Sequence, residues 1–213
     1  MSNNTIQVCE TFVSIQGEST YAGLPCFFVR LAGCNLTCSY CDTPQSRLPG
    51  SPVRISALVK ACCSSKAAIA EITGGEPLIQ PGFPELASAL YRGTQRPVLV
   101  ETNGSIDISI IPPEAIAIVD IKTPGSGMNG SMDIGNIARL RPRDEVKFVI
   151  VDRKDYEWAC RLVRKYKLAE KCHAILFSPV FPALDPSKLG AWILKDRLPV
   201  RLHMQMHKLT GMR

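Results

Sequence analysis

Three cysteines lie within eight residues of one another in the segment GCNLTCSYCDT, which runs from Gly33 to Thr43. Cys34, Cys38 and Cys41 are separated by three and then by two residues. A structural zinc site needs four ligands, usually two cysteine pairs, and the sequence offers no second pair at that spacing. Three thiolates can instead hold three irons of a cubane cluster and leave the fourth iron open to a ligand that is not protein. The triplet therefore predicts a 4Fe-4S cluster with one open position.

The segment TGGEP, from Thr73 to Pro77, is a second candidate site. Two glycines let the backbone approach a ligand closely, and the carboxylate of Glu76 can accept hydrogen bonds from an ammonium group. Alone, Gly-Gly-Glu is equally typical of a turn. Because it follows the cysteine triplet at the end of the next predicted strand, it indicates a ligand site.

Short β-branched runs alternate with helical segments along the chain. Strands are predicted at 26–33, 67–74, 97–104, 115–122, 145–152, 173–180 and 200–207. Helices are predicted at 55–63, 83–93, 154–166 and 186–196. This alternation predicts a parallel sheet covered by helices, joined by right-handed crossovers. A complete eightfold barrel usually needs about 250 residues, so the 213 residues predict a single domain over 1–213 with a mostly parallel sheet in an incomplete, TIM-like barrel.

Parallel α/β folds place their sites at the carboxyl ends of the strands. The residues with chemical function fall at these ends: Cys34 after the first predicted strand, then TGGE, ETNG, DIK and SP, and His207 after the last. The strand assignment did not use these residues. Their common placement therefore supports the predicted fold.

Composition narrows the class of protein. Hydrophobic residues make up 46% and charged residues 21%, as in an ordinary globular protein. The polar start MSNNTIQVCE is unlike a secretory signal, and no apolar run approaches the roughly 18 residues that span a bilayer. We therefore expect a cytoplasmic protein without membrane partners. In that reducing compartment, nine cysteines do not predict disulfides, and the six outside the triplet are expected to be small core residues.

The net charge of +6 is spread along the chain, with its densest patches at 139–143 and 161–167. Neither patch is interleaved with aromatic residues, as a single-strand binder would need. For the second patch a solvated helix face is favoured over nucleic-acid binding, and docking of an acidic redox partner is a weaker alternative.

The cysteine spacing resembles that of the radical S-adenosylmethionine superfamily. There, the open iron is chelated by the amino and carboxyl groups of the cofactor's methionine moiety, and the reduced cluster cleaves the sulfonium to a 5′-deoxyadenosyl radical. The resemblance implies that Tyr40, the aromatic residue before the third cysteine, packs near the adenine. TGGEP strengthens the match.

Longer segments resemble one family, 7-carboxy-7-deazaguanine synthase (QueE). They are residues 12–43, which include SIQGE and end in CDT, and EITGGEPLIQ, VETNG, VDIKTPGSGM, SPVF and HMQMHK. The resemblance implies conversion of 6-carboxy-5,6,7,8-tetrahydropterin to 7-carboxy-7-deazaguanine with loss of ammonia, on the route to queuosine and related 7-deazapurines. It also implies a homodimer, a Mg²⁺ requirement and a reductant such as flavodoxin or ferredoxin.

A carboxylated pterin offers a guanidine-like edge and one carboxylate. Gln16 can donate to and accept from that edge, and Glu18 can accept from its N–H groups. Arg30 lies in an apolar strand and needs an anionic partner, either the substrate carboxylate or another side chain. With the resemblance, the expected substrate contacts are Ile15, Gln16, Gly17, Glu18, Arg30, Thr73, His207 and Arg213, the last through a chain-end carboxylate.

The same resemblance places the cofactor and a metal ion. The expected cofactor contacts are Tyr40, Gly75, Glu76, Asn103, Asp120, Lys122, Ser126, Ser178, Pro179, Val180 and Phe181. Asp120 and Lys122 share one strand face, so a structural ion pair is an equal alternative. Ser178 departs from the glutamine of some relatives. Thr43 alone would suggest a cap or turn, and the resemblance implies a Mg²⁺ ligand completed by substrate oxygens and waters.

Two other interpretations remain at this point. One is a small radical activase that generates a glycyl radical on a partner protein, and the other is a zinc or electron-transfer module without enzymatic activity. Gln16, Glu18, Arg30 and Thr43 argue against the activase, since a protein glycine needs no pterin pocket.

Overall fold

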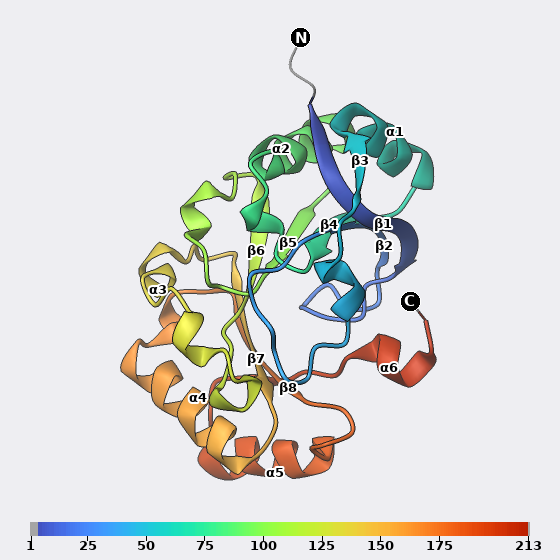
Figure 1. The fold of residues 1–213 in the computed structure, drawn as a ribbon. Helices are drawn as coiled ribbons and strands as arrows, with labels where there is room; N and C mark the ends of the chain where they lie inside the picture. Colours follow the sequence, from blue (N-terminus) through green and yellow to red (C-terminus); the bar gives the residue numbers. More distant parts are fainter. Residues whose placement is uncertain (1–3, 213) are drawn as a thin grey trace.

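Nine strands form one open sheet in the computed structural model, which describes residues 4–212 (Figure 1). The order across the sheet is β3-β1-β2-β4-β5-β6-β7-β8-β9. From β2 to β9 all neighbours are parallel, whereas β1 runs antiparallel to β2 and β3. The predicted incomplete barrel with a mostly parallel sheet is confirmed. The bounds are β1 (Thr5–Ile15), β2 (Pro25–Leu31), β3 (Ser51–Arg54), β4 (Ile69–Gly74), β5 (Val98–Thr102), β6 (Ala115–Asp120), β7 (Glu145–Ile150), β8 (Ala174–Pro179) and β9 (Arg201–Leu202).

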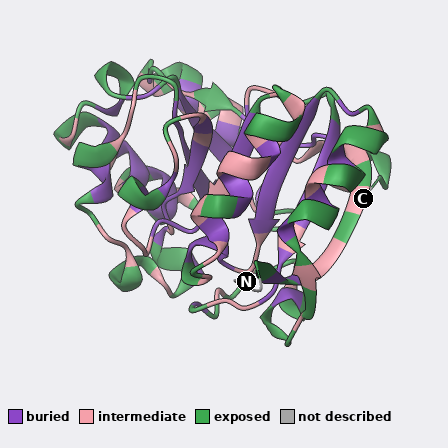
Figure 2. Ribbon diagram, turned by 90° about the horizontal axis from the view of Figure 1, so that it is seen from above, coloured by how far each residue is buried: buried purple, intermediate pink, exposed green. Residues whose placement is uncertain are grey.

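The helices cover the outer face of the sheet. Figure 2 shows the buried strands beside helices whose outward surfaces are exposed. The bounds are α1 (Ile55–Ser65), α2 (Phe83–Thr94), α3 (Asn136–Arg139), α4 (Arg153–Lys165), α5 (Pro186–Asp196) and α6 (Met206–Thr210). The four predicted helices are α1, α2, α4 and α5, so all are confirmed. No helix within residues 4–212 is long and apolar enough to cross a membrane.

Local sequence explains where α4 begins and which face it buries. The Asp152 side chain accepts a hydrogen bond from the backbone N–H of Asp155, which caps the first turn. Tyr156, Ala159 and Val163 recur at helical spacing and are buried against the sheet. α5 starts in the same way, because the side chain of its N-cap aspartate accepts from a backbone N–H of the first turn.

A small apolar cluster closes the inner end of the barrel. Cys26, Phe28, Ile69, Leu99 and Ile118 point inward and pack together, separately from the larger core beneath the helices. Side chains two positions further along a strand lie on the same face. The residues that follow this cluster on β4, β5 and β6 are all acidic: Glu71, Glu101 and Asp120.

The predicted strand at 200–207 is wrong. Only Arg201 and Leu202 pair with β8, and α6 begins at Met206. β8 is the one strand beside this edge segment, and its pairing ends when the chain turns toward the loop after β1. There the backbone N–H of Met206 donates to the carbonyl oxygen of Gly17 at 3.0 Å.

Two antiparallel strands were not predicted. β1 alternates buried and exposed residues over its first half, which is a signal typical of a half-solvated strand. β3 is only four residues long, three of them exposed, and it exists because it pairs with β1. Six of the seven predicted strands are confirmed with small shifts of their ends.

A buried carboxylate holds the loop that follows β6. Asp155 is 1% exposed and accepts hydrogen bonds from the hydroxyl of Thr123 at 2.8 Å, from the backbone N–H of Gly125 at 2.8 Å and from that of Val151 at 3.1 Å. A side chain on an outer helix thereby fixes a loop at the carboxyl ends of the strands.

Replacing Asp155 by alanine should lower the free energy of unfolding by about 3 kcal/mol, because the buried Thr123 hydroxyl and two backbone N–H groups lose a charged acceptor. Urea denaturation of the purified protein measures this change. Glu157→Ala on the exposed side of the same helix removes a surface ion pair with Arg153 and should change the stability by less than about 0.5 kcal/mol. Equal losses in the two variants would contradict the anchoring role of Asp155.

Candidate active site

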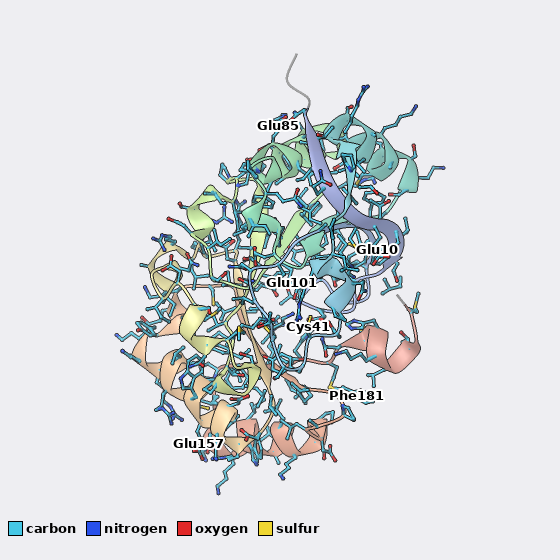
Figure 3. The ribbon with its side chains drawn as sticks, in the orientation of Figure 1. Glu10, Cys41, Glu85, Glu101, Glu157 and Phe181 are labelled. Carbon is cyan, nitrogen blue, oxygen red and sulfur yellow. The ribbon has the colours of Figure 1, made fainter. Side chains whose placement is uncertain are left out.

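A pocket of about 690 Å³ opens at the carboxyl ends of the parallel strands. Its walls come from β1, β2 and β4 to β7, from the cysteine loop, from the chain after β8 and from α6. Figure 3 shows Glu101 and Cys41 in the middle of the molecule, whereas Glu85 and Glu157 lie on outer helices. The fold therefore gathers segments that are distant in sequence around one cavity.

Most of the predicted site residues line this pocket. They are Ile15, Gln16, Gly17, Glu18, Arg30, Cys34, Cys38, Tyr40, Cys41, Thr43, Thr73, Gly75, Asn103, Asp120, Lys122, Val180, Phe181 and His207. Four others stand outside its lining: Glu76, Ser126, Ser178 and Pro179. All four are buried behind the pocket wall. Arg213 lies outside the described residues.

The three cysteines of the triplet are free thiols that line one side of the pocket. The backbone N–H of Leu36 donates to the sulfur of Cys34 at 3.5 Å. Within residues 4–212, no group of three or more cysteine, histidine or acidic side chains is arranged to hold a single metal ion. A cubane cluster takes one thiolate at each of three corners, and three free thiols on one side of the pocket are that set of ligands.

Hydrogen bonds join the cysteine loop to two neighbouring loops. The Ser39 hydroxyl donates to the carbonyl oxygen of Gly125 at 2.8 Å, which ties the cysteine loop to the loop after β6. The side-chain amide of Asn103 donates to the side chain of Asn35 at 3.1 Å, which ties it to the loop after β5. Three strand ends are thus joined around the triplet.

The glycines of TGGEP bring two strand ends into contact. A side chain at Gly75 would overlap the carbonyl oxygen of Gly33 and come within 2.6 Å of the Cβ atom of Cys34. Gly74 has a φ of 151° and packs against the backbone of Leu31. Both glycines are needed for this contact, because other residues carry a Cβ atom. They position the cysteine loop as well as opening backbone to a ligand.

Glu76 is completely buried, and its carboxyl group binds donors of the chain itself. One oxygen accepts from the backbone N–H of Leu78 at 3.0 Å and from the Thr102 hydroxyl at 2.9 Å, and the other accepts from the backbone N–H of Asn103 at 2.6 Å. Burial raises the pKa of Glu76 to about 7 against these hydrogen bonds. The side chain therefore joins the loops after β4 and β5 behind the pocket wall.

The ion pair between Asp120 and Lys122 is present. The Lys122 ammonium lies 2.7 Å from one carboxylate oxygen of Asp120. Within residues 4–212, the other carboxylate oxygen is buried and has no hydrogen-bond partner. Both residues line the pocket beside the cysteine loop, so this pair is structural and is also exposed to any molecule bound there.

Arg30 also has a side-chain partner. Its Nε atom donates to Glu10 at 2.9 Å, and its guanidinium lies 5.7 Å from the ring centroid of Phe12. In the described part of the chain, its two Nη groups make no hydrogen bond. A guanidinium held in place through Nε and open at Nη can bind a carboxylate with two parallel hydrogen bonds.

Lys147 is a buried cation that sequence analysis missed. Its ammonium contacts Glu101, lies 2.7 Å from Glu18 and 3.8 Å from Asp120, and its side chain is 3% exposed. Although burial opposes it, these three carboxylates raise the pKa of Lys147 well above its usual value. A lysine in the apolar run EVKFVI was a signal of the same kind as Arg30.

Lys147 also controls Glu18. Burial alone would raise the pKa of this carboxyl group, but the charge of Lys147 and hydrogen bonds from Lys147 and Gln205 hold it well below its usual value. The Gln205 amide donates to the second oxygen of Glu18 at 2.8 Å. Glu18 is thus a fixed anion whose two oxygens already have donors.

Buried residues also anchor the loop after β1, which carries Gln16 and Glu18. Glu145 accepts hydrogen bonds from the backbone N–H and the hydroxyl of Thr20. The Nε2 atom of His203 accepts from the backbone N–H of Ser19 at 3.2 Å. Burial lowers the pKa of His203 to about 4, so the imidazole is neutral and can accept.

The C-terminal helix closes one side of the pocket. In Figure 1, α6 lies beside the chain that follows β2, and the Lys208 ammonium forms an ion pair with Asp42 at 2.9 Å. A side chain at Gly17 would come within 2.8 Å of the Nδ1 atom of His207. α6 therefore contacts both the loop after β1 and the cysteine loop.

Comparison with known proteins identifies the family. The sequence model of the Radical SAM superfamily matches residues 29–182. A 7-carboxy-7-deazaguanine synthase of Koribacter versatilis is 40% identical over 95% of this chain and 96% of its own length. A synthase of the same name from Chlorobaculum tepidum is 42% identical over 95% of this chain and 93% of its own length. The chain belongs to the 7-carboxy-7-deazaguanine synthase family.

Solved structures show the same fold for this family member. QueE from Escherichia coli superposes with a TM-score of 0.77 over 94% of each chain, at 22% identity. Streptococcus suis SuiB bound to S-adenosylmethionine superposes with a TM-score of 0.61 over 81% of this chain and 48% of its own, at 14% identity. Membership implies a radical enzyme with a 4Fe-4S cluster and S-adenosylmethionine that acts in 7-deazapurine biosynthesis. The glycyl-radical activase and the zinc module are not favoured.

Removing the charge of Lys147 should lower the folding stability by an amount that depends on pH. Lys147→Met leaves Glu18 and Glu101 buried without a cation, which should cost about 3–5 kcal/mol of folding stability at neutral pH. Without the cation these carboxyl groups hold protons more tightly in the folded than in the unfolded protein. The loss should therefore be smallest near pH 4 and grow as the pH rises to 8. Denaturation at several pH values checks this, and a loss independent of pH would contradict it.

Cys38→Ala should lower the iron content of the anaerobically reconstituted protein and stop the formation of 5′-deoxyadenosine, because one corner iron loses its thiolate. Cys160→Ala is a matched control. That residue lies on the buried face of α4 and outside the pocket lining, so its loss should cost only a modest packing penalty and leave iron content unchanged. Unchanged cofactor cleavage by the Cys38 variant would refute the cluster assignment.

Proposed function

We propose that this enzyme converts 6-carboxy-5,6,7,8-tetrahydropterin to 7-carboxy-7-deazaguanine with loss of ammonia. The relatives that match nearly the whole chain carry the name of that product. The observation that carries the proposal is the single pocket that joins the cysteine loop to Arg30 and to a buried polar wall. Such a pocket has one place for a radical-generating cofactor and one for a flat, polar acid.

The cofactor end is assigned to the cysteine loop and the strand ends beside it. When bound, the cluster and S-adenosylmethionine supply a carbon radical made by one-electron cleavage of the sulfonium. Tyr40 would pack against the adenine, and backbone at Gly75 would approach the methionine moiety. Asp120 and Lys122 offer a carboxylate and an ammonium at the same end, and the side chains after β8, Val180 and Phe181, would shield it from water.

The substrate end is assigned to β1, β2, β4 and α6. The Nη groups of Arg30 would bind the substrate carboxylate, with Thr73 on the neighbouring strand beside it. Gln16 and the backbone around Gly17 would contact the ring. His207 lies against that backbone and would contact the ring from the side of α6.

Mg²⁺ is proposed to bind at Thr43, next to the last cysteine. In the structure the Thr43 hydroxyl donates to Asp42 at 2.9 Å, so the hydroxyl lies beside a carboxylate at the pocket rim. Mg²⁺ prefers oxygen ligands and usually keeps several waters. One hydroxyl together with substrate oxygens would suffice.

Thr43→Ala should reduce turnover and weaken its dependence on Mg²⁺ while leaving the iron content intact. The comparison is a Mg²⁺ titration of product formation in the parent and the variant, with Thr43→Ser as the control that keeps a hydroxyl. A variant that responds to Mg²⁺ as the parent does would remove Thr43 from the metal site.

Several further assignments follow from family membership. We propose that the chain forms a single domain, works as a homodimer in the cytoplasm and receives electrons from a small acidic redox protein such as flavodoxin or ferredoxin. The net charge of +6 is compatible with such a partner.

Anaerobic turnover tests the proposed function. The reconstituted enzyme is incubated with 6-carboxy-5,6,7,8-tetrahydropterin, S-adenosylmethionine, Mg²⁺ and a reductant, and the products are identified by mass spectrometry. Formation of 7-carboxy-7-deazaguanine and ammonia is the expected result. Cleavage of S-adenosylmethionine without any change in the pterin would contradict the proposed substrate.

A further inference from the structure

Among the acidic side chains that line the pocket, Glu71 of β4 alone forms no salt bridge within residues 4–212. Four carboxyl groups line the inner pocket wall, those of Glu18, Glu71, Glu101 and Asp120. Lys147 or Lys122 contacts each of the others, and no salt bridge reaches Glu71 within residues 4–212. Glu71 is only 3% exposed. A carboxyl group in such a place is costly to bury unless a donor satisfies it.

One oxygen of Glu71 is left for a ligand. The Gln16 amide donates to Oε2 of Glu71, and its own oxygen accepts from the backbone N–H of Glu18 at 3.0 Å. Gln16 is thereby held between the two acidic residues. In the described part of the chain, Oε1 of Glu71 makes no hydrogen bond. Because Glu71 lines the pocket, a bound molecule can reach this carboxyl group from there.

Glu71 and Arg30 lie on adjacent parallel strands with their side chains on the same face. Arg30 pairs in register with Thr73, so Glu71 is two residues deeper in the barrel than Arg30. This places the two Cα atoms about 6.6 Å apart along the strands and about 4.8 Å apart across them. A guanidinium near the mouth and a carboxyl group deeper in the pocket suit a flat molecule with a carboxylate at one end and N–H donors at the other.

We propose that Glu71 is a specificity-determining residue whose Oε1 atom accepts a hydrogen bond from the exocyclic 2-amino group of the pterin. The inference rests on the proposed function, because the pterin supplies that amino group. Glu71 would thereby select 2-amino rings over their 2-oxo counterparts. Each oxygen of Glu18 already accepts from Lys147 or Gln205, whereas Oε1 of Glu71 accepts from no residue of the described chain, which favours Glu71 for this role.

The charges around Glu71 support this assignment. Burial, Glu101 and Glu18 raise its pKa to about 8, against the hydrogen bond from Gln16 and the charge of Lys147. The Cys26 thiol is the remaining titratable neighbour. Near pH 7 the carboxyl group therefore holds a proton when no ligand is bound. A donor at Oε1 favours the ionised form, so binding of a 2-amino ring should release a proton, and affinity should rise as the pH approaches about 8.

The test compares two stable probes, 6-carboxypterin and its 2-oxo counterpart 6-carboxylumazine. Dissociation constants are measured anaerobically by calorimetry on the reconstituted holoenzyme with S-adenosylmethionine. Above about pH 8, where Glu71 is ionised and can only accept, the parent should bind 6-carboxypterin about 10- to 100-fold more tightly, the range of one charge-assisted hydrogen bond. Glu71→Gln should bring the ratio close to one, because an amide can donate to the oxo group. The same ratio in parent and variant would overturn the inference.

Asp144→Asn is the matched control. Asp144 is also a buried carboxyl group, but it binds Arg141 and the backbone N–H of Ala117 and stands outside the pocket lining, so this variant should keep the parent's ratio. If Asp144→Asn abolished the preference as Glu71→Gln does, a general loosening would explain both, and the role of Glu71 would be refuted.

A second measurement needs no variant. Calorimetry of the parent in two buffers with different ionisation enthalpies should show proton release at pH 7 on binding 6-carboxypterin, and less on binding 6-carboxylumazine. Equal proton release for the two probes would contradict the inference. These results are separate from the proposed function, which fails only if the parent forms no 7-carboxy-7-deazaguanine.

Discussion

The ammonium group of Lys147 contacts the carboxyl groups of Glu18 and Glu101 and lies 3.8 Å from Asp120. Those partners come from the loop after β1, from β5 and from β6, so one cation joins distant parts of the barrel wall. Glu18 in turn accepts from Gln205, just before α6. The arrangement of the polar wall therefore depends on the charge of Lys147, because without it these carboxylates would be buried and uncompensated.

The barrel divides into a dry end and a wet end. Below, Phe28, Leu99 and Ile118 belong to the apolar cluster that excludes water. Above it, each strand places a polar residue two positions further along, on the same face. This alternation concentrates buried charge next to the cysteine loop. Molecules bound in the pocket above this wall would displace water from it, which suits radical chemistry that must be kept from side reactions.

Much of this organisation is visible in the sequence. The cysteine triplet, TGGE and the apolar strands predict the fold and the cluster end of the site, because these signals are local. Arg30 could be identified because a charge interrupts an apolar strand, and the same reasoning would have found Lys147, Glu71 and Glu101.

The rest depended on tertiary contacts. The partners of Lys147 lie 129 and 46 residues away in the chain, and no spacing rule indicates them. The strand predicted at 200–207 failed for a related reason, because the contact between Met206 and Gly17 ends the strand and starts a helix. The cofactor contact expected for Glu76 stays a prediction, and its hydrogen bonds to Thr102 and Asn103 become visible only when the two loops are brought together.

The most direct test of this account is an anaerobic crystal structure of the reconstituted enzyme with S-adenosylmethionine and 6-carboxypterin. The account predicts a cluster bound by Cys34, Cys38 and Cys41, the pterin carboxylate on Arg30, and the 2-amino group within hydrogen-bonding distance of Glu71. A ring bound outside the barrel, or one with its carboxylate directed toward Lys147 and its amino group toward the mouth, would contradict it.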